Sequence, residues 1–386
     1  MPRATENTAT VTNVNDLNKL TPPPPEGWKS GVQWDGESGE VTTPPIPEGQ
    51  EVDWEDVLSV FGLSPDTHMI DGPVRFSVWD VPGHGLQRAY RARVVIKPER
   101  SFEVDDLLDE IYLGEINPLP TTEKYWLTLQ IGDTHIGKGE DDGGGTQAIC
   151  NQWKTSVTRA LQNFNGTGIH LAFLGDLIEG IVSNDGKNVT GNDLSLTEQL
   201  RVARHMVNWT IMEAMEHTTN IVISAVPGNH GDTTRSFKTN MADNYDIDIV
   251  AAAQQAFDLS NARDMLDTFV WHFPESKDGY VTYQVGDTTF TSVHGHLFKG
   301  QPIEGARKWW SGLSFNKRPP AESQILMSGH YHHLQVVNLT ADKWLMFSPS
   351  LETESNWLVQ KDGSSARPGI LAYKTLDGYP YDISVV

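Results

Sequence analysis

Residues 125–137 read YWLTLQIGDTHIG, an apolar run that ends in a glycine, an aspartate and a histidine. Two later stretches repeat this plan, IHLAFLGD at residues 169–176 and NIVISAVPGNH at residues 220–230. Short, nearly continuous apolar runs are typical of parallel strands buried on both faces. Because segments with helical periodicity separate these runs, the sequence predicts an α/β layered fold.

The segments around these strands predict helices and a second sheet. Ser195 and Glu198 form the S-x-x-E signature of a capping box, and a helical apolar pattern continues to about Met215. Another helix is predicted over residues 243–257. The later segments contain more hairpin turns and predict a second sheet packed face to face on the first. These segments are residues 280–296, 324–333, 334–348 and 369–376.

Composition suggests how the 386 residues are divided. Residues 1–50 contain TPPPPEG and TTPPIPEG, which predict an extended or disordered tail. Residues 51–115 predict a small α+β module with a helix near Trp54, a β-hairpin and an acidic linker around EVDDLLDE. Residues 120–386 are expected to form the main domain. On the second hairpin strand, a basic face with Arg91 and Arg93 is either solvated surface, the more common case, or a nucleic-acid contact.

Charge and cysteine content exclude several classes of protein. The formal net charge is -22, from 51 acidic and 29 basic residues, so no overall positive field attracts nucleic acid or an anionic membrane. A polyanionic substrate would need bound cations or a local basic patch. The single cysteine, Cys150, excludes an intramolecular disulfide and a cysteine-based metal site. With no signal-like segment or membrane-length apolar run, we expect a cytoplasmic protein.

Each of five apolar runs ends in a polar cluster. Binding sites in open α/β sheets form beyond the carboxyl ends of the strands, so we expect these clusters to meet in one pocket. A single GD, GNH or histidine after a strand is also typical of an ordinary turn. Only the occurrence of all five clusters in one chain indicates a functional site. The clusters contain Asp133 and His135, then Asp176, then Asn229 and His230, then His294 and His296, and finally His330 and His332.

Carboxylate, amide and imidazole groups indicate a transition-metal site. In an extended segment residues i and i+2 point the same way, so Asp133 with His135 and His330 with His332 are each expected to reach one point. Seven of these residues are candidate ligands, which is too many for one ion: Asp133, His135, Asp176, Asn229, His294, His330 and His332. Two ions about 3.5 to 4 Å apart that share a carboxylate would use all of them, and such a pair is suited to phosphoester hydrolysis.

These residues resemble the ordered signature of the calcineurin-like metallophosphoesterase superfamily, D-x-H, G-D, G-N-H, H and G-H-x-H. The resemblance covers about residues 125–350 and implies a two-sheet α/β/β/α sandwich, with the small α+β module preceding it. It implies that Asp133, His135, Asp176 and His332 hold one ion. It implies that Asp176, Asn229, His294 and His330 hold the other.

The same resemblance implies roles for two further histidines. His230 would face the phosphate and act as a general acid, or alternatively orient a ligand. Of the two histidines in HGH, the family pattern favours His294 as the ligand, and His296 becomes a candidate for contact with substrate. Manganese is the expected metal, with iron, nickel and zinc as alternatives.

Within the superfamily, the layout looks most like SbcD-type DNA exonucleases and their phage-encoded relatives. Residues 299–320 are locally basic and carry Arg307, Lys308 and Trp309, a combination that can track a phosphate backbone and stack bases. Arg235 after GNHGD extends this candidate surface. The equally good alternative is an amphipathic helix that packs on the sheet through its tryptophans.

The expected function is therefore a metal-dependent DNA nuclease that acts in the cytoplasm, or in the host cytoplasm for a phage protein. The resemblance also admits a homodimer and a partner ATPase. A cyclic-nucleotide or other small-molecule phosphodiesterase and a protein phosphatase are alternatives, since one fold hosts many substrates. A metal-free interaction scaffold is the alternative from another class, and the intact set of seven ligands argues against it.

Overall fold

The protein is described from a computed structural model. The structure describes residues 29–47, 49–81, 85–97, 103–109, 124–139, 144–260, 269–352 and 366–386. The chain divides into two compact units, Met1–Glu99 and Arg100–Val386. Each unit has its own buried residues. Within the described residues no helix has both the length and the apolar character needed to span a membrane.

Within its described residues, the first unit is a five-stranded sheet with one helix. Its long hairpin strands pair antiparallel, and the second of them also pairs with two short strands. The helix is capped by the Asp53 side chain, which accepts the N–H groups of Glu55 and Asp56. The elements are β1 (Gly31–Trp34), β2 (Ser38–Thr42), β3 (Ile46–Pro47), α2 (Trp54–Val60), β4 (His68–Val81) and β5 (Gly85–Ile96).

The second unit is built on a six-stranded sheet in which four consecutive strands, up to one edge of the sheet, run parallel, whereas the next strand pairs with them antiparallel. Three of these strands are buried on both faces, which explains why the sequence shows continuous apolar runs there. In sheet order the strands are β16 (Tyr379–Val385), β15 (Leu371–Leu376), β6 (Trp126–Ile131), β7 (Gly168–Phe173), β8 (Ile221–Ala225) and β9 (Phe269–His272).

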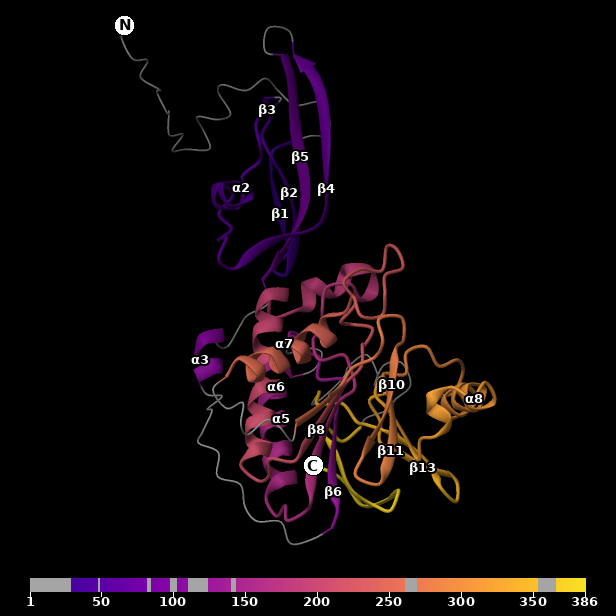
Figure 1. Ribbon diagram of the computed structural model, residues 1–386. Coiled ribbons are helices and arrows are strands. Elements are labelled where there is room, and N and C mark those ends of the chain that lie inside the picture. The colour runs from indigo at the N-terminus through magenta and orange to yellow at the C-terminus, as the bar shows by residue number, and fades with distance from the viewer. Residues whose placement is uncertain are drawn as a thin grey trace, which may run out of the picture. The chain divides into compact units, whose positions relative to one another are not determined.

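Helices cover one face of this sheet (Figure 1). The longest begins with the predicted capping box, because Ser195 caps the N–H of Glu198 and the Glu198 side chain accepts the N–H of Ser195. Trp153 anchors the helix before it, being fully buried with its indole N–H donating to Thr210. The helices are α3 (Val104–Asp109), α5 (Gly145–Leu161), α6 (Leu196–Met215) and α7 (Tyr245–Leu259), with a 3-10 segment η1 (Ser183–Gly191).

The other face packs on a second, five-stranded sheet (Figure 1). Alternation along β12 shows the layering, since Ile325 and Met327 face the first sheet whereas Leu326 packs under α8. The predicted two-sheet α/β/β/α sandwich is thus confirmed. In sheet order the strands are β10 (Tyr280–Val285), β11 (Thr288–Val293), β12 (Ile325–Ser328), β14 (Lys343–Phe347) and β13 (Gln335–Thr340), with α8 (Pro302–Phe315) and η3 (Pro319–Ala321) outside.

Three expectations about elements are wrong. Residues 31–47 of the predicted tail contribute strands to the first unit, while residues 1–28 lie outside the described part. Within the acidic linker, residues 104–109 form α3, and Val104 and Leu108 are buried in the core of the second unit. Residues 371–376 pair with β6 in the first sheet and do not belong to the second.

Candidate metal centre

The loops that leave five strands bring the predicted ligands together. β6, β7 and β8 are parallel neighbours in the first sheet, and β11 and β12 are parallel neighbours in the second. Their carboxyl ends therefore lie at one edge of each sheet. His330 connects the two sheets directly, since its backbone N–H donates to Asp133 Oδ2 at 2.8 Å.

Asp133, His135 and His332 form the first group of potential metal ligands. His135 Nδ1 donates to Glu179 at 2.9 Å, which leaves Nε2 with a lone pair, 3.3 Å from His332 Nε2. Asp133 Oδ1 lies 3.5 Å from His332 Nε2 and is buried without a hydrogen-bond partner. A buried carboxylate oxygen without a partner is costly, and a cation at this point would satisfy it.

Asp176, His294 and His330 form the second group. His294 Nδ1 donates to the carbonyl of Leu174 at 2.8 Å, and its Nε2 lies 3.0 Å from Asp176 Oδ2 and 3.1 Å from Asn229 Oδ1. Thus the structure places Asn229 beside this group. It also places His294, rather than His296, at the carboxylate.

The electrostatics of His294 point to a cation at the same position. Burial alone would lower its pKa, but the Asp176 carboxylate raises the pKa to about 10. Burial likewise opposes ionisation of Asp176, yet the surrounding histidines, His294 foremost, hold its pKa well below the usual value. The point where a carboxylate, an amide oxygen and an imidazole converge therefore favours positive charge, which a divalent cation can supply in place of a proton.

The backbone at the ligands differs from the extended geometry expected from the sequence. Asp133, His135 and Asp176 have φ of 50°, 49° and 51°, and His330 and His332 have φ of 72° and 56°. These are left-handed conformations, which are uncommon for non-glycine residues and concentrate at functional sites. The predicted i, i+2 pairs do converge, but through tight left-handed loops after each strand. The explanation by strand alternation is wrong.

His230 and Glu179 lie beside the first group and, with His135, form a third group of potential metal ligands. His230 Nδ1 lies 3.2 Å from Glu179 Oε2 and 3.0 Å from the Glu179 carbonyl, and the same carboxylate accepts from His135. Burial opposes protonation of His230, but Asp176 and Glu179 raise its pKa to about 9. His230 therefore holds a proton at neutral pH, as a general acid requires. Glu179 lies within the LGDLIEG stretch, where no feature of the sequence distinguishes it from an ordinary acid.

A second acid missed at the sequence level, Asp246, supports the loop that carries Asp176. Its carboxylate accepts the backbone N–H groups of Asp176, Leu177 and Gly228, at 2.9, 2.9 and 3.0 Å. Burial and the nearby Asp176 charge raise its pKa to about 7. In the sequence Asp246 is an ordinary acid in the first turn of a helix, so only the fold reveals this contact.

The predicted substrate residues separate into two places. His296 and Arg235 lie at the metal centre: the His296 ring is 5.5 Å from that of His294, and Arg235 donates to the carbonyl of Asn229. Trp309 packs against Tyr280 and Phe298 on the outer face of the second sheet.

The remaining basic candidates are on α8. Arg307 forms an exposed ion pair with Glu304 at 2.7 Å, and Lys308 is exposed on the same helix. Together with the buried Trp310, this arrangement matches the alternative of a tryptophan-bearing amphipathic helix that packs on the sheet.

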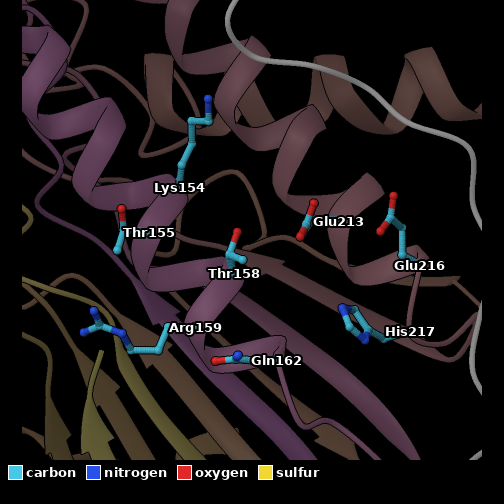
Figure 2. Close-up of a pocket in the computed structure, with 8 residues that line it drawn as sticks. All are labelled: Lys154, Thr155, Thr158, Arg159, Gln162, Glu213, Glu216 and His217. Atoms are coloured by element: carbon cyan, nitrogen blue, oxygen red, sulfur yellow. The ribbon is translucent and has the colours of Figure 1, made fainter.

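A separate hollow of about 630 Å³ lies between α5 and α6 (Figure 2). Its two lysine and arginine side chains are balanced by two glutamates, and none of the predicted site residues lines it. Figure 2 shows the lining residues Lys154, Thr155, Thr158, Arg159, Gln162, Glu213, Glu216 and His217.

Comparison with known proteins finds similarity in structure only. No protein-family model and no curated protein matches the sequence. A conserved uncharacterized protein from Streptococcus pneumoniae TIGR4, titled a predicted phosphoesterase, has 12% identity, coverage of 66% of this chain and 84% of that chain, and a TM-score of 0.30. Wild-type Vps29 from Entamoeba histolytica, complexed with Zn²⁺, has 13% identity, coverage of 67% and 98%, and a TM-score of 0.29.

A purple acid phosphatase from yellow lupin seeds has 12% identity, coverage of 90% of this chain and 69% of that chain, and a TM-score of 0.32. The function proposed below rests on the site residues.

Proposed function

We propose that the protein is a dinuclear-metal phosphoesterase that hydrolyses phosphodiester bonds. The observation that carries this proposal is the convergence of two donor groups, each with two imidazoles and a carboxylate, the first of which contains a buried carboxylate oxygen without a hydrogen bond. Asp133, His135 and His332 would hold one ion. Asp176, Asn229, His294 and His330 would hold the other, with Asp176 shared. When bound, such ions supply a nucleophile from water at neutral pH and stabilise charge on phosphoryl oxygens.

The chain's own residues supply the proton transfer and the positioning. His230 holds a proton on a ring that Glu179 orients, and it would donate that proton to the leaving oxygen. Glu179 also fixes the tautomer of His135, which keeps the lone pair of Nε2 free to bind a metal ion. Asp246 holds the Asp176 loop through three backbone hydrogen bonds, so the shared carboxylate is positioned before substrate binds.

We propose DNA as the substrate, with Mn²⁺ as the metal and Arg235 and His296 as the residues that face it. The exposed side chains of Phe237 and Leu297, 68% and 61% accessible, flank these residues in the chain and could contact bases. The test is cleavage of 3′-labelled single-stranded and duplex DNA with Mn²⁺, beside hydrolysis of bis-p-nitrophenyl phosphate. Hydrolysis of the small ester without DNA cleavage would support the phosphoesterase proposal and contradict the nuclease proposal.

A small-molecule phosphodiesterase is the second candidate, because the net charge of -22 opposes binding of a polyanion. Salt dependence separates the two substrates. The apparent affinity for DNA should fall steeply as salt rises, whereas that for a cyclic nucleotide should change little. Arg235→Ala should weaken DNA cleavage more than hydrolysis of the small ester, with Lys308→Ala on α8 as the matched control.

The first prediction separates metal binding from proton donation. Asp176→Asn should abolish hydrolysis and lose bound metal, because this carboxylate faces His294 and is proposed to be shared. His230→Ala should lower the rate by a factor of about 10² to 10⁴ and retain the metal, because its ring is not proposed as a ligand. Metal content by mass spectrometry of the purified variants is the measurement. Equal loss of metal in both variants would contradict the separation of roles.

A further inference from the structure

Glu352 is a buried acid at the metal centre that lies outside every motif of the sequence. It follows β14 and is 5% exposed. Its Oε1 lies 3.6 Å from His135 Nε2, and its Oε2 lies 3.9 Å from His332 Nδ1. Both histidines belong to the first group of ligands. Glu352 is therefore a second carboxylate beside the first group of ligands, in addition to Asp133.

The atom that Glu352 approaches is the one left free to bind a cation. Because His135 Nδ1 donates to Glu179, Nε2 presents its lone pair, and it lies 3.3 Å from His332 Nε2. Spacings of 3.3 to 3.6 Å between donor atoms suit ligands that share one ion at bond lengths of about 2.0 to 2.2 Å. Two carboxylates and two imidazoles would also balance the charge of a divalent cation.

The backbone and a lysine hold Glu352 in this place. Ser350 Oγ accepts the N–H of Glu352 at 3.0 Å and donates to the carbonyl of Asp133 at 2.7 Å, so the two acids are tied together. Lys138 Nζ lies 3.0 Å from each carboxylate oxygen. A buried carboxylate needs a counter-charge, and Lys138 supplies it when no cation is bound.

We propose that Glu352 is a further ligand of the first metal ion and that Lys138 positions its carboxylate. The proposal rests on the proposed dinuclear site. Glu352 has no counterpart in the superfamily signature. Lys138 would stay hydrogen-bonded to one oxygen of Glu352 while the other oxygen binds the ion. The plain alternative is a buried ion pair that stabilises the fold and has no part in metal binding.

Calorimetric titration of the metal-free full-length protein with Mn²⁺ tests the proposal. The wild type should bind two ions. Glu352→Gln should weaken one of them at least about 10-fold and leave the other unchanged. Lys138→Met should still bind both ions, because the cation replaces the lost counter-charge, but it should bind the first ion more weakly than the wild type, because the Glu352 carboxylate is no longer positioned. Lys374→Met, which breaks an ion pair with Asp382 on β16, is the control and should match the wild type.

Thermal unfolding with and without Mn²⁺ distinguishes ligation from fold stability. Lys138→Met should lower Tm without metal and recover most of the loss with Mn²⁺, whereas Glu352→Gln should recover less. If Glu352→Gln does not fold, Glu352→Asp keeps the charge but shortens the reach, and it should weaken the same ion. Unchanged Mn²⁺ affinity in the Glu352 variants overturns the proposal. Failure of the wild type to bind Mn²⁺ would instead overturn the proposed function.

Discussion

At the scale of single residues, the site depends on close contacts that only glycine permits. A Cβ on Gly228 would collide with the backbone N and the carboxylate of Asp176, and one on Gly329 would lie 2.6 Å from Asp133 Oδ2. Because these atoms belong to the tightly held ligand loops, they cannot move away without displacing a ligand. The glycines at 228 and 329 therefore preserve the positions of the two aspartates.

We predict that Gly228→Ala reduces Mn²⁺ affinity and hydrolysis by at least about 10-fold. The added methyl group pushes Asp176 from the position where it faces His294. Gly312→Ala in α8 is the matched control, because its Cβ would meet nothing within 4 Å, and it should leave Mn²⁺ binding unchanged. Calorimetric titration of both variants is the measurement. Normal Mn²⁺ affinity in Gly228→Ala would show that the Asp176 loop can move freely.

The sequence predicted candidate site residues where they directly follow a strand. It did not predict residues that reach the site only through tertiary packing. All seven candidate ligands lie directly after apolar runs, so the strand pattern located them. Glu179, Asp246 and Glu352 reach the site only through tertiary packing. Asp246 looks like a common helix-start acid, and Glu352 lies 20 residues after His332 with no motif around it. No local pattern distinguishes such residues from surface acids.

At the scale of elements, a buried polar network joins the two sheets. His170 on β7 contacts Thr128 on β6 through Nδ1 at 3.2 Å and the Tyr283 hydroxyl on β10 through Nε2 at 2.9 Å. The Tyr283 hydroxyl in turn donates to Ser224 on β8 at 2.6 Å. Because every partner is fixed on a strand, the network aligns the sheets more specifically than apolar packing alone.

We predict that His170 makes the protein acid-sensitive. Burial lowers its pKa from 6.5 to about 3, so below pH 6.5 the unfolded chain binds a proton that the folded chain does not. Stability is then lost as pH falls from about 6.5 towards 3, by up to about 1.4 kcal/mol per pH unit.

His170→Gln removes this proton uptake. Between pH 6 and 4, its free energy of unfolding should change with pH less steeply than that of the wild type, although the variant is less stable at pH 7 through lost hydrogen bonds. Urea unfolding in matched buffers measures both slopes. Identical slopes would mean that His170 becomes protonated in the folded state.

Element prediction succeeded where periodicity is strong and failed where pairing is non-local. The capping box of α6 and the apolar runs of β6, β7 and β8 specify their own structure. β15 has the same alternating pattern as a strand of the second sheet, and only its antiparallel pairing with β6 assigns it to the first. β1 to β3 are too short to be recognised within a proline-rich segment, since their stability comes from pairing, of β2 and β3 with β5 and of β1 with β2.

At the scale of the whole molecule, the two units differ greatly in how many apolar side chains they bury. The first unit has a small apolar cluster of Leu58, Leu63 and Val94, with Val32, Trp34 and Ile70 packed against it. The second unit has three clusters that include most of the large buried side chains. Hydrophobic stabilisation scales with buried apolar area, so the second unit should be much the more stable.

We predict two separate unfolding transitions for the full-length protein. In urea, the first unit should unfold separately and at the lower concentration, because its apolar cluster is small and, among the described residues, shares no member with the clusters of the second unit. Tryptophan fluorescence follows both transitions, with Trp34 and Trp54 in the first unit and Trp153 and Trp209 in the second.

A chain of residues 100–386 should then show only the later transition, bind Mn²⁺ as the full chain does and hydrolyse bis-p-nitrophenyl phosphate at a similar rate. Every proposed ligand lies within these residues, which is why small-ester hydrolysis should not need the first unit. A single cooperative transition in the full chain, or an unfolded 100–386 chain, would show instead that the second unit depends on the first for its stability.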